Sequence, residues 1–275
     1  MRFLLFLIVA AACVTFSQEE PEETFYLSPS IFFTNGDYST NANSNSAAFY
    51  NTAQILNELF LINHYEFLKI NGADYYYTQQ AFLAGGLINL FPYYLKFNYV
   101  HYKGNYDYKP SDYSYNDYTN LYNIDFSYYL DLFYLGASYT HLNQIGYAKA
   151  VSNQFTLRLE KILSNEFFIS LKPSLTKIEG SSNLFSASAK LHYAPYRDLI
   201  FKIGGFGGER AFYFDSDLLT IFNQNSIQKY QIFGQMEYSP LQDFWLILGY
   251  QQTKFTDYKI NYLVAGIRGN FQVAK

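Results

Sequence analysis

The chain has 275 residues, a formal charge of −4 at pH 7 and a mean hydropathy of −0.13. Because no basic patch or run accompanies this mild charge, nucleic acid is excluded as an expected partner. The single cysteine is Cys13, so the chain beyond it can hold no disulfide framework, cysteine metal site or thiol nucleophile.

The first residues predict a signal peptide. Arg2 is followed by an apolar run from Phe3 to Cys13 and then by the small residues Thr15 and Ser17. The run is too short for a membrane-spanning helix, which needs roughly 20 apolar residues. We expect residues 1–17 to be cleaved off after Ser17. The alternative is a lipoprotein signal that ends at Cys13. An ordinary leader is favoured because the residue three positions before Cys13 is Ala, whereas lipoprotein signals usually have Leu there.

Beyond residue 23, apolar and polar residues alternate with a period of two. In the clearest segment, Phe167–Thr176, Ile169 and Leu171 share one face while Ser170 and Lys172 share the other. Successive side chains of a strand point to opposite sides, so each such segment is predicted to be a strand with one apolar and one polar face. The predicted strands are 24–34, 46–56, 59–71, 74–87, 93–105, 119–130, 132–143, 150–163, 165–178, 183–193, 197–209, 227–238, 243–255 and 259–273. This makes about 14 strands, with 12 as the alternative because 46–56 and 59–71 alternate weakly.

The connections between these strands alternate in length. The tight ones are Asn57-Glu58, 88–92, Asp131, Ser164, 194–196 and 239–242, and the long ones are 35–45, 106–118 and 210–226. Short turns at one end, longer loops at the other and an even strand number are typical of transmembrane β-barrels. The chain is therefore predicted to be all-β, a transmembrane antiparallel up-and-down barrel with short periplasmic turns and longer extracellular loops. Residues 18–23 would form a short periplasmic segment before a single barrel domain over 24–275.

Three features favour a barrel with a polar interior and an apolar exterior. The strands are long enough to cross a bilayer at a tilt, which takes about 9–11 residues. Aromatic residues make up 21% of the chain and crowd the strand ends, as at Tyr75-Tyr76-Tyr77 and Tyr128-Tyr129, like the aromatic girdles of membrane barrels. The polar face mixes charged residues with Ser, Thr and Gln, as a water-filled lumen would require.

These residues resemble those of bacterial outer-membrane β-barrel (porin-like) proteins. The resemblance covers residues 24–273 and rests on the leader ending Phe16-Ser17-Gln18, the aromatic-rich alternating strands, and a last strand with Gly266, Arg268 and Phe271. That last strand is similar to the assembly signal of the class, although residues 272–275 follow Phe271 and Gly269 stands where an apolar residue is usual. The resemblance implies an outer-membrane location, with membrane lipid and the assembly machinery as partners.

The polar face supplies the candidate lumen-lining residues. They are Lys96, Asp125, Arg158, Glu160, Lys172, Lys190, His192, Lys202, Lys229, Glu237 and Arg268. Basic residues predominate, which favours anions in a pore. We therefore expect a passive channel for small polar or anionic solutes. The alternative is a plugged barrel with a structural or surface-interaction role, suggested by the tyrosine-rich segment 106–118 and by the apolar segment 210–226, which we expect to fold into the lumen or lie on its rim.

A lipid-modifying enzyme is the second alternative, and it rests on His101 and His141. Both are expected to face lipid near the outer rim, but no serine nucleophile with an orienting acid accompanies them on that face. The glycine-rich Gly204–Gly208 has no helix after it, so it is interpreted as glycines that let a strand bend or lie near bulky neighbours. No metal-ligand or nucleotide-binding spacing occurs, so no catalytic, cofactor or metal site is predicted.

Overall fold

The computed structural model describes residues 24–111, 113–146, 149–215, 220–222 and 226–274. The predicted signal peptide and the segment 18–23 lie outside these residues. Within them, no helix combines the length and the apolar character needed to cross a bilayer.

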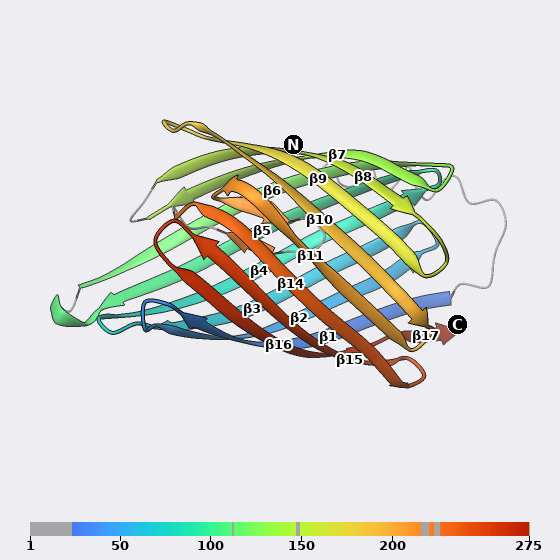
Figure 1. The fold of residues 1–275 in the computed structure, drawn as a ribbon, viewed down its shortest axis with the longest axis horizontal. Helices are drawn as coiled ribbons and strands as arrows, with labels where there is room; N and C mark the ends of the chain where they lie inside the picture. Colours follow the sequence, from blue (N-terminus) through green and yellow to red (C-terminus); the bar gives the residue numbers. More distant parts are fainter. Residues whose placement is uncertain (1–23, 112, 147–148, 216–219, 223–225, 275) are drawn as a thin grey trace.

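Fourteen long antiparallel strands form a closed barrel (Figure 1). They are β1 (Thr24–Tyr38), β2 (Asn43–Leu56), β3 (Leu59–Asn71), β4 (Tyr75–Leu90), β5 (Tyr93–Tyr108), β6 (Tyr113–Leu130), β7 (Phe133–Ile145), β8 (Ala150–Ile162), β9 (Phe167–Ile178), β10 (Asn183–Tyr196), β11 (Leu199–Arg210), β14 (Gln228–Leu241), β15 (Phe244–Phe255) and β16 (Lys259–Gly269). Each pairs with its neighbour in the chain, and β1 pairs with β16 to close the ring. The short β17 (Phe271–Ala274) continues β16 along β1, so Thr24 and Ala274 lie opposite each other at the end with the short turns. The architecture predicted from the alternation, including the weak strands 46–56 and 59–71, is confirmed.

The connections differ from the prediction at the end opposite the termini. The short turns are confirmed, but β1 and β2 extend through most of 35–45, and β5 and β6 extend through most of 106–118. The tip of β5–β6 carries only the 3-10 turn η1 (Lys109–Ser111) and projects past the neighbouring strands (Figure 1). Polar and tyrosine-rich residues were predicted as loop, yet strand pairing continues through them because stacked rings such as Tyr106 and Tyr115, with centroids 4.9 Å apart, support the pairing.

Pro29 and Pro173 lie well inside strands of the barrel wall, and the pairing explains how the wall tolerates them. The ladder between β8 and β9 is interrupted next to Pro173, between the pairs Thr156–Ser174 and Leu159–Leu171. Likewise, Pro29 lies next to the break at Asn270 that separates β16 from β17. Proline has no N–H to donate, so each one occupies a place where the ladder on one side is already open.

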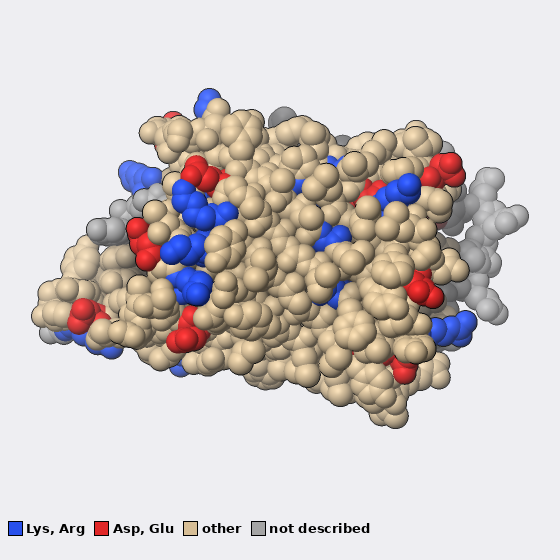
Figure 2. Space-filling model, viewed as in Figure 1, with Lys and Arg blue, Asp and Glu red and all other residues tan. Residues whose placement is uncertain are grey.

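The apolar face of the wall points outward. Most of the exposed large hydrophobic side chains alternate along the strands, among them Phe33, Phe82, Leu157, Ile203 and Leu248. In Figure 2 the charged side chains gather mainly toward the two ends of the barrel, and the surface between them is mostly uncharged. A closed barrel pairs its strand edges internally, so such a surface can lie in hydrocarbon without unpaired backbone groups.

The inward face is more apolar than the alternation predicts. Cross-strand neighbours on β4 to β7, Leu83, Val100, Leu121 and Leu142, point into the lumen and are almost fully buried. A second apolar cluster lies on the side of β1–β3 and β15–β16; its buried members are Tyr38, Ala42, Ile70, Phe255 and Ile260. The polar and charged inward residues occupy the other part of the lumen.

Candidate functional site: the closed lumen

The chain between β11 and β14 turns into the barrel and forms a small hairpin. β12 (Tyr213–Asp215) pairs with β13 (Thr220–Phe222), and Phe212 and Phe214 are buried. We call residues 211–222, as far as the structure describes them, the lumen hairpin. For the described residues 210–215, the prediction that 210–226 folds into the lumen or lies on its rim is decided in favour of the lumen.

Glycines at the end of β11 permit this turn. Gly208 has φ +110, a backbone conformation that side-chain-bearing residues rarely adopt, and a Cβ there would lie 2.4 Å from the backbone oxygen of Phe185. The register between β11 and β14 shifts between Gly207 and Arg210, which is the bulge that directs the chain inward. The interpretation of Gly204–Gly208 as a bending point agrees with this geometry.

Two side chains of β8 hold the lumen hairpin by its backbone. The Gln154 amide donates to the Phe214 carbonyl at 2.9 Å and accepts from the Phe214 N–H at 2.9 Å. The Ser152 hydroxyl donates to the Phe212 carbonyl at 3.3 Å. These bonds satisfy buried backbone groups that would otherwise be costly to leave unpaired.

The apolar side chains of the lumen hairpin complete an internal core. Ala211, Phe212 and Phe214 pack in one cluster with the inward-facing residues Leu83, Val100, Leu121 and Leu142, among others. Because this part of the wall is apolar, burying the two phenylalanines against it removes apolar surface from water and stabilises the closed arrangement.

Arg210 lies at the base of the lumen hairpin between two rings. Its guanidinium carbon is 3.4 Å from the Phe206 ring centroid and 4.3 Å from that of Tyr213. It also donates to Gln228 at 2.7 Å and to Gln231 at 3.1 Å. Burial raises the pKa of the Tyr213 hydroxyl, and the nearby Asp215 carboxylate raises it further, so this hydroxyl stays neutral.

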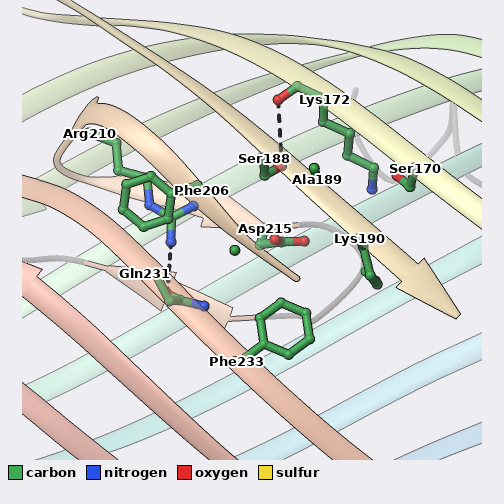
Figure 3. A pocket seen from close by; sticks show the side chains of 11 residues that line it. Ser170, Lys172, Ser188, Ala189, Lys190, Phe206, Arg210, Asp215, Gln231 and Phe233 are labelled. Carbon is green, nitrogen blue, oxygen red and sulfur yellow. Dashed lines mark hydrogen bonds between the residues drawn. The ribbon is translucent and has the colours of Figure 1, made fainter. Parts of the chain in front are cut away.

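Asp215, at the end of β12, carries a carboxylate into a basic part of the lumen. It lines a cavity of about 30 Å³ together with Lys172, Lys190 and Arg210, and it interacts electrostatically with all three. Figure 3 shows Asp215 between Arg210 on one side and Lys172 and Lys190 on the other. A second cavity, of about 10 Å³, also borders Asp215. Spaces of this size hold roughly one or two water molecules each, so the lumen hairpin nearly fills this part of the barrel.

Four of the predicted lumen residues form one ion-pair network. Arg158 donates to Asp125 at 2.7 Å and to Glu160 at 3.1 Å, and Lys172 lies 3.7 Å from Glu160. The Ser170 hydroxyl donates to Glu160 at 2.9 Å. Lys96 pairs with Asp125 across β5 and β6 and interacts with it electrostatically.

A second network lies around Glu237, which is 1% exposed. Lys202 forms an ion pair with one carboxylate oxygen, and Arg268 donates to the other at 2.9 Å. His192 lies beside Lys202 in the register, and its ring meets that of Phe168 edge-on at 5.4 Å.

Lys229 is placed differently from the other predicted lumen residues. It forms an ion pair with Glu209 where β11 and β14 carry their register shifts, and the two side chains are 39% and 46% exposed. It therefore takes no part in the buried networks. The bulges break the period of two, which is why alternation alone assigns it to the lumen.

Sequence reasoning missed four residues that the structure brings into the lumen: Glu66, Gln154, Arg210 and Asp215. Gln154 lies on the polar face of the predicted strand 150–163, and Glu66 lies in 59–71, where the weak alternation gives no clear face. Arg210 and Asp215 lie in the segment predicted as loop, where no period assigns a direction. The apolar triplet beside them, Phe212-Tyr213-Phe214, was the available signal that this loop is buried.

The two histidines behind the enzyme alternative contact amide oxygens. His101 Nδ1 lies 3.0 Å from Asn120 Oδ1, which also accepts from the Tyr99 hydroxyl at 2.9 Å. His141 repeats this arrangement on β7 and β8, with Asn153 at 3.0 Å and the Tyr139 hydroxyl donating to the same oxygen at 2.6 Å. These contacts describe polar side chains that satisfy one another on the outer surface. Across the described ranges, no group of three or more His, Cys, Asp or Glu residues is placed to hold a metal ion.

No protein-family model and no curated protein matches the sequence. Among solved structures, the toluene transporter TodX of Pseudomonas putida matches with a TM-score of 0.55 at 10% identity, covering 91% of this chain and 90% of that chain. A deltaS2 mutant of the TodX monoaromatic hydrocarbon channel matches with a TM-score of 0.54 at 11% identity, covering 95% and 92%. The translocator domain of the autotransporter NalP from Neisseria meningitidis gives 0.46 at 8% identity, covering 98% and 96%. At these identities the likeness concerns the fold alone, and that fold is the one of bacterial outer-membrane β-barrel proteins.

Proposed function

We propose that this protein is a passive channel of the outer membrane for small polar or anionic solutes, closed by the lumen hairpin. The observation that carries the proposal is how the lumen is closed. The lumen hairpin, which belongs to the connection between β11 and β14, folds inward and occupies the lumen next to the charged wall. Eight-stranded barrels are filled by side chains alone, whereas fourteen strands enclose a wider lumen that needs an added element to close it.

The charges of the lumen support a preference for anions. Basic side chains outnumber acidic ones: Lys96, Arg158, Lys172, Lys190, Lys202, Arg210 and Arg268 against Glu66, Asp125, Glu160, Asp215 and Glu237. An excess of fixed positive charge attracts anions and repels cations. Two structures of similar fold are described as a toluene transporter and a hydrocarbon channel. The charged wall of this lumen favours polar solutes instead.

The exterior supports a membrane location. The uncharged outer face and the hydrogen-bonded Tyr, His and Asn side chains near one rim suit hydrocarbon and a membrane–water boundary, respectively. Outer-membrane lipid is accordingly the proposed surrounding partner.

Replacing residues 212–225 with a short Gly-Ser linker tests the channel. In planar bilayers the intact protein should show a small conductance, and the variant should show one at least several-fold larger, because the lumen hairpin occupies the part of the lumen beside β8. In a KCl gradient the reversal potential of the variant should indicate anion preference, and Lys172→Glu with Lys190→Glu should shift it toward cations.

Removal of 106–115, the projecting tip of β5–β6, is the matched control and should leave the conductance of the intact protein unchanged. A variant without the hairpin that inserts at the same density and stays silent would contradict the channel. That outcome would favour the second candidate, a closed barrel with a surface-interaction role, which the stacked tyrosines of the β5–β6 tip support.

A further inference from the structure

The lumen hairpin inserts a carboxylate among basic side chains of the barrel wall. Lys172 comes from β9, Lys190 from β10 and Arg210 from β11, so three adjacent strands converge on Asp215. Ser170 and Gln231 line the same cavity and add hydrogen-bonding groups. Converging cations with neighbouring hydroxyl and amide groups are what proteins use to bind carboxylates.

The wall side of this arrangement is held in place by other contacts. Arg210 is fixed by Gln228, Gln231 and the Phe206 ring, and Lys172 is held near Glu160. These contacts involve wall residues only, so they do not depend on Asp215. Arg210 and Lys172 therefore each keep a wall contact when the hairpin is absent, which favours a preformed binding site.

We infer that Lys172, Lys190 and Arg210 form a binding site for a small carboxylate, and that Asp215 occupies it as an internal ligand while the lumen hairpin is docked. A carboxylate solute and the hairpin then compete for the same groups, and solute binding releases the hairpin. That control of opening rests on the proposed channel function, whereas the binding site itself does not.

Acetate is the probe, since it has the chemical form of the aspartate side chain. Asp215→Asn keeps the shape of the residue and removes its charge, so the side chain no longer competes as an anion for the basic groups, and the packing changes little. In detergent micelles, isothermal titration of this variant with acetate should show saturable binding, at least several-fold tighter than to the intact protein. Adding Lys190→Gln should weaken that binding several-fold. Adding Lys161→Gln, a lysine over the Phe133 ring on the outer face, should not.

Hydrogen exchange of the Phe214 amide reports docking independently of conductance, because this N–H donates to Gln154. In the intact protein, acetate should speed its exchange several-fold in a saturable way, while chloride at the same ionic strength should not. Asp215→Asn should exchange quickly without acetate, and Asp198→Asn, in an exposed turn, should behave like the intact protein.

Equal acetate binding with and without the Asp215 charge, or equal effects of acetate and chloride, would overturn the inference. Acetate-dependent exchange without any current in the hairpin-free variant would leave the site standing and remove the channel. Current in the hairpin-free variant without any effect of acetate on exchange would support the channel and remove the carboxylate site.

Discussion

Glu237 is a buried carboxylate whose two oxygens serve different basic partners. Replacing it with Gln leaves the charges of Lys202 and Arg268 without their counter-ion in the lumen. We expect Glu237→Gln to lower the free energy of unfolding by about 2–4 kcal/mol, because breaking a buried pair leaves an uncompensated charge. Urea unfolding in phospholipid vesicles, followed by the fluorescence of Trp245, the single tryptophan, measures this directly.

Glu209 supplies the matched control, since it also pairs with a lysine but on an exposed part of the wall. Glu209→Gln should cost less than about 1 kcal/mol, because exposed ion pairs contribute little. Equal losses for the two variants would show that burial of Glu237 does not govern its contribution.

The direction of most lumen side chains could be predicted from alternation, as the networks around Glu160 and Glu237 show. The ion-pair partners of these side chains could not be predicted, because a period of two shows which face a residue lies on but not which residues of other strands it contacts. Arg158 contacts Asp125 from two strands away through the curvature of the closed wall, which no local pattern encodes. Lys229 shows a related limit: it lies at a register shift of β14, and one extra residue in a bulge reverses the direction of the next side chain, so alternation does not determine its face.

At the scale of elements, Gly208 controls the point where β11 leaves the wall. Gly208→Ala forces a residue with a Cβ into φ +110 and against the backbone of Phe185, at a cost of about 1–3 kcal/mol. We expect this strain to loosen the lumen hairpin and to speed exchange of the Phe214 amide about tenfold or more.

Gly207→Ala is the comparison one residue earlier, where an added Cβ meets nothing within 4 Å. Exchange in that variant should match the intact protein. If both alanines behaved alike, the left-handed conformation of Gly208 would not be what positions the hairpin.

The positions of the strands, and their ends at the short turns, are the part of the fold that the sequence predicts best. Alternation extends over whole strands, and turn residues mark their ends on the side of the short connections. The lumen hairpin is a different kind of element. Its inward course depends on Gln154 and on an apolar patch from strands β3 to β10, and these come together only in the folded wall.

At the scale of the whole molecule, the outward face should tolerate charge according to depth. Leu157, in the middle of β8, and Phe185, near the end of β10, both point outward. In vesicles, Leu157→Lys should destabilise the barrel by about 2–4 kcal/mol and Phe185→Lys by about 0–1 kcal/mol, because a lysine is most costly at the centre of the hydrocarbon. Unfolding in urea measures both, and the same small effect at both positions would mean that this face does not lie in lipid.

The hydrogen bonds between Gln154 and Phe214 also have a consequence for the order in which the barrel wall and the lumen hairpin form during biogenesis. The hairpin's binding surface is assembled from β3 to β10, so it does not exist while the nascent sheet is still open. The lumen hairpin can therefore dock only after strands β3 to β10 have paired and curved around this surface. A protected amide at Phe214 then reports that this part of the wall has formed.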